Sequence, residues 1–110
     1  MVRKDIKHVR GDTFAFDLTI SGIENVTVES IYFSARSKIS KWAYAFQKSI
    51  GDGITLIDTL KYRVRLAPED TATLAPGDYD YDLQIGLGAD IWTVMGGNFT
   101  ITKDVTEETT

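Results

Sequence analysis

Apolar and polar residues alternate at every second position along several stretches of this chain. In TFAFDLTI, residues 13–20, the apolar side chains in phase are Phe14, Phe16, Leu18 and Ile20. A period of two is the pattern of a β-strand with one buried and one solvated face, because successive side chains of a strand point in opposite directions. Helical periodicity is nearly absent, so the alternation predicts an all-β fold.

The alternation extends over most of the chain. It recurs in ESIYFSARSK (29–38), WAYAFQKS (42–49), KYRVRL (61–66) and YDYDLQI (79–85). Glycine-rich stretches at 51–53 and 86–90 predict turns, and Gly96-Gly97 predicts a break or bulge in the last strands. Two prolines and several turn residues exclude a strand from APEDTATLAPGD, residues 67–78. Eight or nine short strands at this spacing predict a β-sandwich or barrel.

One local feature favours the immunoglobulin-like sandwich. In EDTATLAPGDYDY, residues 69–81, a turn, a leucine and Gly77 precede a tyrosine at the start of a strand. In that fold a tyrosine at this corner lies two residues before the second core cysteine. We therefore expect Tyr79 to be the corner tyrosine, with its hydroxyl bound to backbone at residues 69–72. Tyr81 then fills the space between the sheets where a cysteine would stand.

Composition and length set the domain organisation and exclude several functions. The chain has 110 residues, which is enough for one domain with its own core. We expect one immunoglobulin-like β-sandwich of two antiparallel sheets over residues 1–106, followed by a short polar tail at 107–110. The net charge of −4 argues against a nucleic-acid partner, and the zero cysteines exclude disulfides and thiolate metal sites. We also expect no signal peptide and no membrane-spanning segment.

The residues that carry catalysis or bind metals in other proteins are few. His8 is the single histidine, and no strained nucleophile turn of the G-x-S-x-G type is present. One histidine cannot supply a typical zinc site. We therefore expect no catalytic residue, no cofactor and no metal, and the chain is not expected to be an enzyme.

Asp78, Asp80 and Asp82 form an alternating row of carboxylates, the ligand type that binds calcium when a loop brings such groups together. Alternate side chains on a flat strand lie about 7 Å apart and point in parallel, which suits a solvated face instead. Basic residues alternate in the same way at 61–65. Cross-strand pairing is therefore favoured over calcium binding. In the immunoglobulin strand order TFAFDLTI pairs with KYRVRL, and YDYDLQI pairs with IYFSARSK. We therefore expect Asp17 beside Arg63 or Arg65, and Asp80 or Asp82 beside Arg36.

The tripeptide Arg10-Gly11-Asp12 matches a cell-adhesion motif, but it lies between two predicted strands. An adhesion ligand needs a projecting loop tip. The alternative is a turn in which Gly11 adopts a positive φ and Asp12 caps the amide of Thr13 or Phe14. The residue preferences favour the turn.

Three aromatic residues are candidates for binding a partner: Trp42, Tyr44 and Trp92. They can line a contact surface for protein or carbohydrate. They can equally fill the core, because strand aromatics are often buried and the chain has only five phenylalanines. The core interpretation is favoured, and both stay open.

The order of motifs over residues 5–106 resembles the N-terminal domain of phage baseplate upper proteins, a family of bacteriophage and prophage immunoglobulin-like proteins. The motifs are RGDTFAFDLTI, IYFSARSK, AFQKSIGDGITLID, VRLAPEDTATLAPGDYDYDLQI and TVMGGNFTITKDVT. In those proteins a longer assembly region follows this domain, whereas the present sequence ends at Thr110, so a stand-alone protein is expected. The resemblance implies a non-catalytic structural or assembly protein of a tail, baseplate or neck.

The same resemblance implies partners and a location. The partners are other phage structural proteins, or further copies of the chain in a homo-oligomer, and the location is the virion or the host cytoplasm during assembly. Exposed edges at the expected first strand, residues 5–9, and at residues 42–49 would serve such contacts. The alternative function is a module whose loops bind carbohydrate or another component of the host surface.

Overall fold

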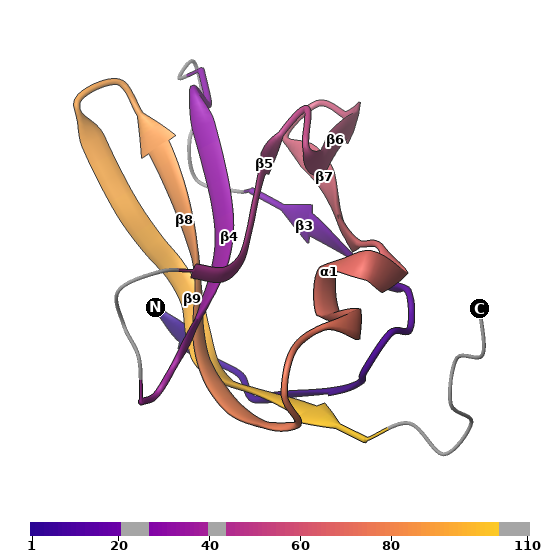
Figure 1. Cartoon of the computed structure of the whole chain (residues 1–110). Helices are drawn as coiled ribbons and strands as arrows, with labels where there is room; N and C mark the ends of the chain where they lie inside the picture. The colour runs from indigo at the N-terminus through magenta and orange to yellow at the C-terminus, as the bar shows by residue number, and fades with distance from the viewer. Residues whose placement is uncertain (21–26, 40–43, 104–110) are drawn as a thin grey trace.

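A computed structural model of the chain describes residues 1–20, 27–39 and 44–103 (Figure 1). It is nearly all β. The strands are β1 (Val2–Arg3), β2 (Ile6–Val9), β3 (Phe14–Thr19), β4 (Ser30–Ser37), β5 (Tyr44–Ile50), β6 (Gly53–Asp58), β7 (Lys61–Leu66), β8 (Gly77–Leu87) and β9 (Asp90–Thr102), and the helix is α1 (Pro68–Ala72).

The strands form one hydrogen-bonded path in the order β1-β9-β8-β4-β5-β6-β7-β3, with β2 beside β9. The two separate antiparallel sheets expected from the sequence are therefore not seen. Two residue pairs, Ser49 with Gly53 and Ile50 with Ile54, join β5 to β6 in parallel and connect what would be two sheets. The path curls, so that β3 and β7 face β4 and β8 across the interior (Figure 1).

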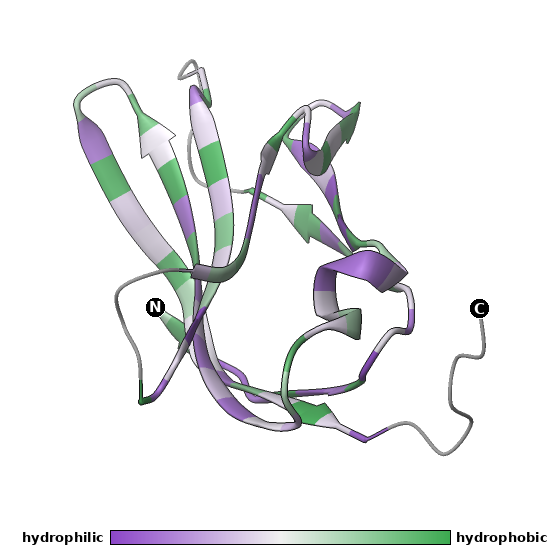
Figure 2. Ribbon diagram, viewed as in Figure 1, coloured by the Kyte–Doolittle hydropathy of each residue, from purple (hydrophilic) through white to green (hydrophobic). Residues whose placement is uncertain are grey.

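The predicted strand pairs are confirmed where they were specified. TFAFDLTI pairs with KYRVRL as β3 with β7, and IYFSARSK pairs with YDYDLQI as β4 with β8. Asp17 lies opposite Arg63, whose Nε is 2.9 Å from the Asp17 carboxylate, and Arg36 lies opposite Asp80. Figure 2 shows the alternation of hydrophobic and hydrophilic residues along β4 and β8 that set this register.

An aromatic cluster fills the space inside the curl. Phe33 of β4 and Phe99 of β9 are fully buried, and their ring centroids are 6.3 Å apart. From the opposite wall, the ring of Phe16 lies 5.5 Å from that of Phe33, and the ring of Phe14 lies 6.0 Å from that of Phe99. Burial of each such side chain contributes about 1.5–3 kcal/mol. The cluster therefore holds β3 against β4 and β9.

The proline-containing segment forms α1, a helix of one turn. Its first residue is Pro68, which suits the start of a helix because its missing N–H has no partner there. The Ala67 amide donates to the Asp70 carboxylate at 2.7 Å. As expected, residues 67–76 contain no strand. The next strand, β8, begins at Gly77, which has a φ of +144°. Alternation gives no signal for a helix this short, so the sequence did not predict it.

Tyr79 forms a corner of the predicted kind, with a different acceptor. Its side chain is 9% exposed, and its hydroxyl donates to the Ala75 carbonyl at 2.7 Å. The prediction that the acceptor lies within residues 69–72 is wrong, because those residues belong to the helix α1. The Thr71 carbonyl, for example, accepts from the Leu74 amide.

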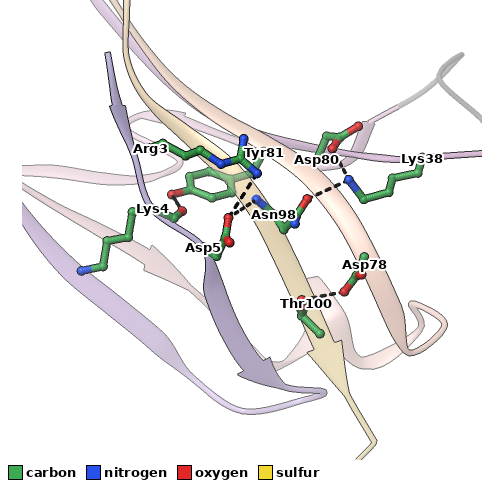
Figure 3. A network of polar contacts seen from close by, with 9 residues as sticks. All are labelled: Arg3, Lys4, Asp5, Lys38, Asp78, Asp80, Tyr81, Asn98 and Thr100. Atoms are coloured by element: carbon green, nitrogen blue, oxygen red, sulfur yellow. Dashed lines mark hydrogen bonds and ion pairs between the residues drawn. The ribbon is translucent and has the colours of Figure 1, made fainter.

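Tyr81 is buried in the aromatic cluster, and its hydroxyl reaches the N-terminal segment. It donates to the Lys4 carbonyl, while the Lys4 amide donates to the Gly96 carbonyl at 2.9 Å. The Asp5 carboxylate accepts from the Asn98 amide at 3.0 Å (Figure 3). These bonds hold β1 and β2 parallel to β9, with Val2 beside Met95 and Ile6 beside Phe99.

Gly97 is required by this close approach rather than by a strand break. A Cβ at Gly97 would lie 2.7 Å from the Lys4 carbonyl oxygen. The break or bulge predicted at Gly96-Gly97 is wrong, because both glycines pair with β8. The bulge lies at Val94, where the register shifts between Leu83 and Gln84. The glycines in the sequence therefore mark a crowded contact, not an interrupted ladder.

We expect Gly97→Ala to lower the free energy of unfolding by about 1–3 kcal/mol, the usual cost of forcing extra volume into a packed site. Gly88→Ala is the control, because Gly88 has a φ of +64° and nothing within 4 Å of the added carbon. That change introduces backbone strain alone, at about 1 kcal/mol. Urea denaturation measures both. Equal losses would mean that the Lys4 carbonyl can move aside.

We expect Tyr79→Phe to cost about 1 kcal/mol, the net value of its buried hydrogen bond. Tyr62→Phe is the control: Tyr62 is equally buried, and its hydroxyl makes no hydrogen bond to another described residue. Thermal and urea unfolding should therefore separate the two variants. A Tyr79→Phe protein as stable as Tyr62→Phe would remove the corner's contribution to stability.

Candidate functional site

The aromatic residues expected to bind a partner or fill the core lie on the surface where the structure describes them. Tyr44 is 45% exposed and Trp92 is 56% exposed, so the core interpretation is wrong for both. Trp42 lies outside the described residues. Tyr44 and Trp92 line two different grooves and do not form one platform.

Arg10-Gly11-Asp12 is a turn packed against α1. Gly11 has a φ of +81°, and its amide donates to Thr71 Oγ1 at 2.9 Å. The Asp12 amide donates to the Val9 carbonyl at 3.1 Å. Among the described residues, the expected cap from the Asp12 carboxylate to the Thr13 or Phe14 amide does not form. Backbone bonds and Thr71 hold the turn instead.

His8 is buried at the same junction. Its ring lies 5.5 Å from the ring of Phe14, and Nε2 is 3.4 Å from Thr71 Oγ1. Burial lowers the pKa of His8, and the nearby Asp12 only partly opposes this effect. The imidazole is therefore neutral at physiological pH and contributes to packing between β2, β3 and α1. It lines none of the three grooves described below.

A polar groove of about 430 Å³ lies on the outer face of β4, β5 and β8. We call this surface the polar groove; its lining residues are Tyr32, Ser34, Arg36, Tyr44, Gln47, Asp80, Tyr81, Asp82 and Gln84. The guanidinium carbon of Arg36 lies 4.3 Å from the centroid of the Tyr44 ring, a cation–π contact. Gln47 Nε2 donates to Ser34 Oγ at 3.1 Å. The groove offers amides, hydroxyls and charges close together.

The carboxylate row is divided among different partners. Asp78 accepts from the Thr100 hydroxyl at 2.6 Å, and Asp80 pairs with Lys38 (Figure 3). Asp82 is half-buried in the polar groove. Burial raises the pKa of Asp82, and the charge of Arg36 partly opposes that rise. The expectation of a uniformly solvated row is therefore wrong at Asp82, because the row enters the groove there.

Trp92 lies in a second, apolar groove of about 540 Å³. We call it the apolar groove; its lining residues are Met1, Val2, Leu18, Thr19, Ile20, Ile85, Leu87, Trp92, Thr93, Val94 and Met95. The neighbouring Ile91 and Val2 are also well exposed. Exposed apolar side chains gathered in one place are typical of a surface that binds a partner.

Metal-binding and membrane-spanning features are not found in the described ranges. Within residues 1–20, 27–39 and 44–103, no three histidine, aspartate or glutamate side chains gather as a metal site would need. No helix in the same ranges has the length and apolar character needed to cross a bilayer.

No family model matches the chain, and no curated protein matches it. Solved structures do. An endo-β-1,4-mannanase from Thermotoga petrophila aligns over 92% of this chain and 18% of its own, with 10% identity and a TM-score of 0.61. This likeness shows the fold alone: the chain has the fold of a part of that enzyme and spans less than a fifth of its length.

Two further structures align less closely. A Bacteroides vulgatus protein assigned to the glycoside hydrolases aligns over 90% of this chain and 16% of its own, with 15% identity and a TM-score of 0.49. The extracellular domain of a voltage-gated sodium channel β4 subunit aligns over 94% of this chain and 93% of its own, with 15% identity and a TM-score of 0.45.

We expect Asp82→Asn to raise the free energy of unfolding at neutral pH. In the folded chain Asp82 keeps its proton to a higher pH than in the unfolded chain, where the pKa of this carboxyl has its ordinary value of 3.8. Between the unfolded and the folded pKa, the folded state therefore binds more protons than the unfolded state. The free energy of unfolding falls as pH rises through this range and stays lower at higher pH. Asparagine removes this penalty.

Urea unfolding at neutral pH and at about pH 3, where carboxyls are largely protonated, measures the difference. The gain should shrink at the acidic pH. Asp80→Asn is the control, because it removes an ion pair to Lys38 and should give no gain. An Asp82→Asn protein that is less stable at neutral pH would show that the charged form is favoured in the groove.

Proposed function

We propose that the chain is a non-catalytic, immunoglobulin-like β-sandwich protein of a phage or prophage particle, in the tail, baseplate or neck. It acts through contacts with other structural proteins. Three lines of support converge on this proposal. They are the motif order along the sequence, the pairing of β3 with β7 and of β4 with β8, and the tyrosine corner at Tyr79.

The observation that carries the protein-contact part is the apolar groove around Trp92. Trp92 is 56% exposed, with Val2 and Met95 beside it in the groove. Tryptophan is enriched among the residues that dominate binding energy at protein interfaces. Covering these side chains with a partner would remove apolar surface from water at about 25 cal/mol per Å².

The environment of His8 supports the non-catalytic part. His8 is the single histidine of the chain, and it packs between aromatic rings and the buried hydroxyl of Thr71. The one carboxyl with a raised pKa among the described residues, Asp82, lies opposite Ser34, whose hydroxyl accepts from Gln47 Nε2 at 3.1 Å. These surroundings suit binding.

A second candidate function is binding of host-surface carbohydrate at the polar groove. Tyr32 and Tyr44 are exposed there, and Gln47, Gln84 and Asp82 supply donors and acceptors for hydroxyl groups. The chain also shares its fold with part of a mannanase, but this likeness gives no information on what the present chain binds. The polar groove and the apolar groove lie on different residues, so variants can separate the two functions.

Mass spectrometry of particles purified from an induced host tests the proposal. The chain should be present in mature particles or in assembly intermediates from the same lysate, because a scaffold can leave before maturation. Trp92→Ser should be lost from those particles, and Tyr44→Ser, which removes an exposed aromatic side chain from the other groove, should be retained. Circular dichroism confirms that both variants fold.

Two outcomes would contradict the proposal. One is absence of the chain from both particles and intermediates. The other is binding of the purified chain to host polysaccharide that Tyr44→Ser abolishes and Trp92→Ser does not, which would favour the second function.

A further inference from the structure

The strand β3 ends the hydrogen-bonded path and has an open edge. The Ile20 amide donates to the Leu60 carbonyl at 2.9 Å, and pairing with β7 continues in register from there to Phe14. In an antiparallel pair, alternate residues point their N–H and C=O groups to opposite sides. The backbone groups of Ala15, Asp17 and Thr19 therefore face away from β7. No residue of the described ranges pairs with them.

A third groove, of about 470 Å³, runs along this edge. We call it the β3 slot. One wall is β3 itself, the other is formed by residues 4–7, and the half-buried side chains of Phe14, Phe16 and Leu18 lie between them. Leu18, Thr19 and Met95 also line the apolar groove, so the two grooves are continuous.

We propose that the β3 slot binds an extended segment of a partner chain, which adds a strand to β3. The open N–H and C=O groups repeat about every 7 Å along β3, a spacing that another extended backbone matches. Apolar residues at alternate positions of the segment would cover Phe16 and Leu18. Residues 4–7 bound the slot on the side that faces β3, whereas the β3 edge of a second copy would bring its neighbouring β7 into the same space.

Charges around the slot specify the segment further. Asp17 is paired with Arg63, and Asp5 is held by the Asn98 amide and lies 3.6 Å from Arg3. Lys4 and Lys7 are exposed in the slot wall and form no ion pair with a described residue. Figure 3 shows Lys4 extending away from the Tyr81–Asn98 network. Acidic residues alternating with apolar ones are therefore favoured in the segment.

This inference rests on the proposed function, because the β3 slot is continuous with the apolar groove proposed to contact a partner protein. It adds what kind of segment that partner presents. The probe is a synthetic eight-residue peptide in which valine alternates with glutamate and threonine. We expect it to bind, and to slow hydrogen exchange at the amides of Ala15, Asp17 and Thr19. A matched peptide with lysine in place of glutamate should bind more weakly.

Two protein variants test the mode of binding. Ala15→Pro removes one open N–H without removing a bond to β7, and it should weaken the peptide about tenfold or more. Ala15→Ser keeps the N–H and should bind as the unaltered chain does. A double change, Lys4→Glu with Lys7→Glu, leaves the edge intact and should reverse the preference to the lysine peptide.

The proposal is overturned if neither peptide binds, if protection appears on another strand, or if Ala15→Pro folds and binds as Ala15→Ser does. Should Ala15→Pro fail to fold, an unreversed preference in the double variant overturns it instead. Failure of the particle experiment with peptide binding intact would reject the phage assignment and leave the strand site standing. If the Trp92→Ser protein is lost from particles but neither peptide binds, the strand site is rejected and the phage assignment stands.

Discussion

Contact between the rings of Phe33 and Phe99 is the interaction on which the curled sheet depends. These two side chains come from different strands, and each also meets a ring from β3: Phe16 contacts Phe33, and Phe14 contacts Phe99. Backbone pairing between β5 and β6 is only two residue pairs long, so it cannot fix the position of β3 by itself. Aromatic packing inside the curl supplies that constraint. His8 and Thr71 extend the same packing to the N-terminal turn and to α1.

A single path of strands that curls back on itself must still end somewhere, and the two ends determine the surface. At one end β1 and β2 are fixed on β9, and at the other end β7 is the only strand of the described residues that pairs with β3. The apolar groove and the β3 slot both lie where these ends approach one another, and they share Leu18, Thr19 and Met95. The polar groove lies on the outer face of β4, β5 and β8, where the ladder is complete. Grooves of two different chemistries therefore follow from the topology.

Alternation predicted most of the strands, and the immunoglobulin strand order predicted two of the strand pairs. Asp17 with Arg63 and Arg36 with Asp80 were both predicted from the order of the motifs. The parallel pairing of Ser49 and Ile50 with β6, which joins the sheets, was not predicted, because two residue pairs leave no recognisable pattern in the sequence. Exposure was also misjudged: Tyr44 and Trp92 sit in strands with apolar neighbours, and a period of two does not say which face is outside. Of the two edges expected, the first strand at residues 5–9 corresponds to β2, which lies off the main path beside β9. The other, β5, has neighbours on both sides, and the path ends at β1 and β3 instead.

The parallel pairing of the N-terminal strands with β9 has a consequence for synthesis on the ribosome. Asp5 binds Asn98, 93 positions further along the chain, and Lys4 is bound by Tyr81, 77 positions along. Translation proceeds at about 5–20 residues per second, and contacts of such separation form only after the later partner has emerged. Residues 4 and 5 leave the exit tunnel before residues 81 and 98, and they are thus among the last to find their native neighbours. Until β9 has emerged, the backbone groups of β1 and β2 that pair with it lack their native partners.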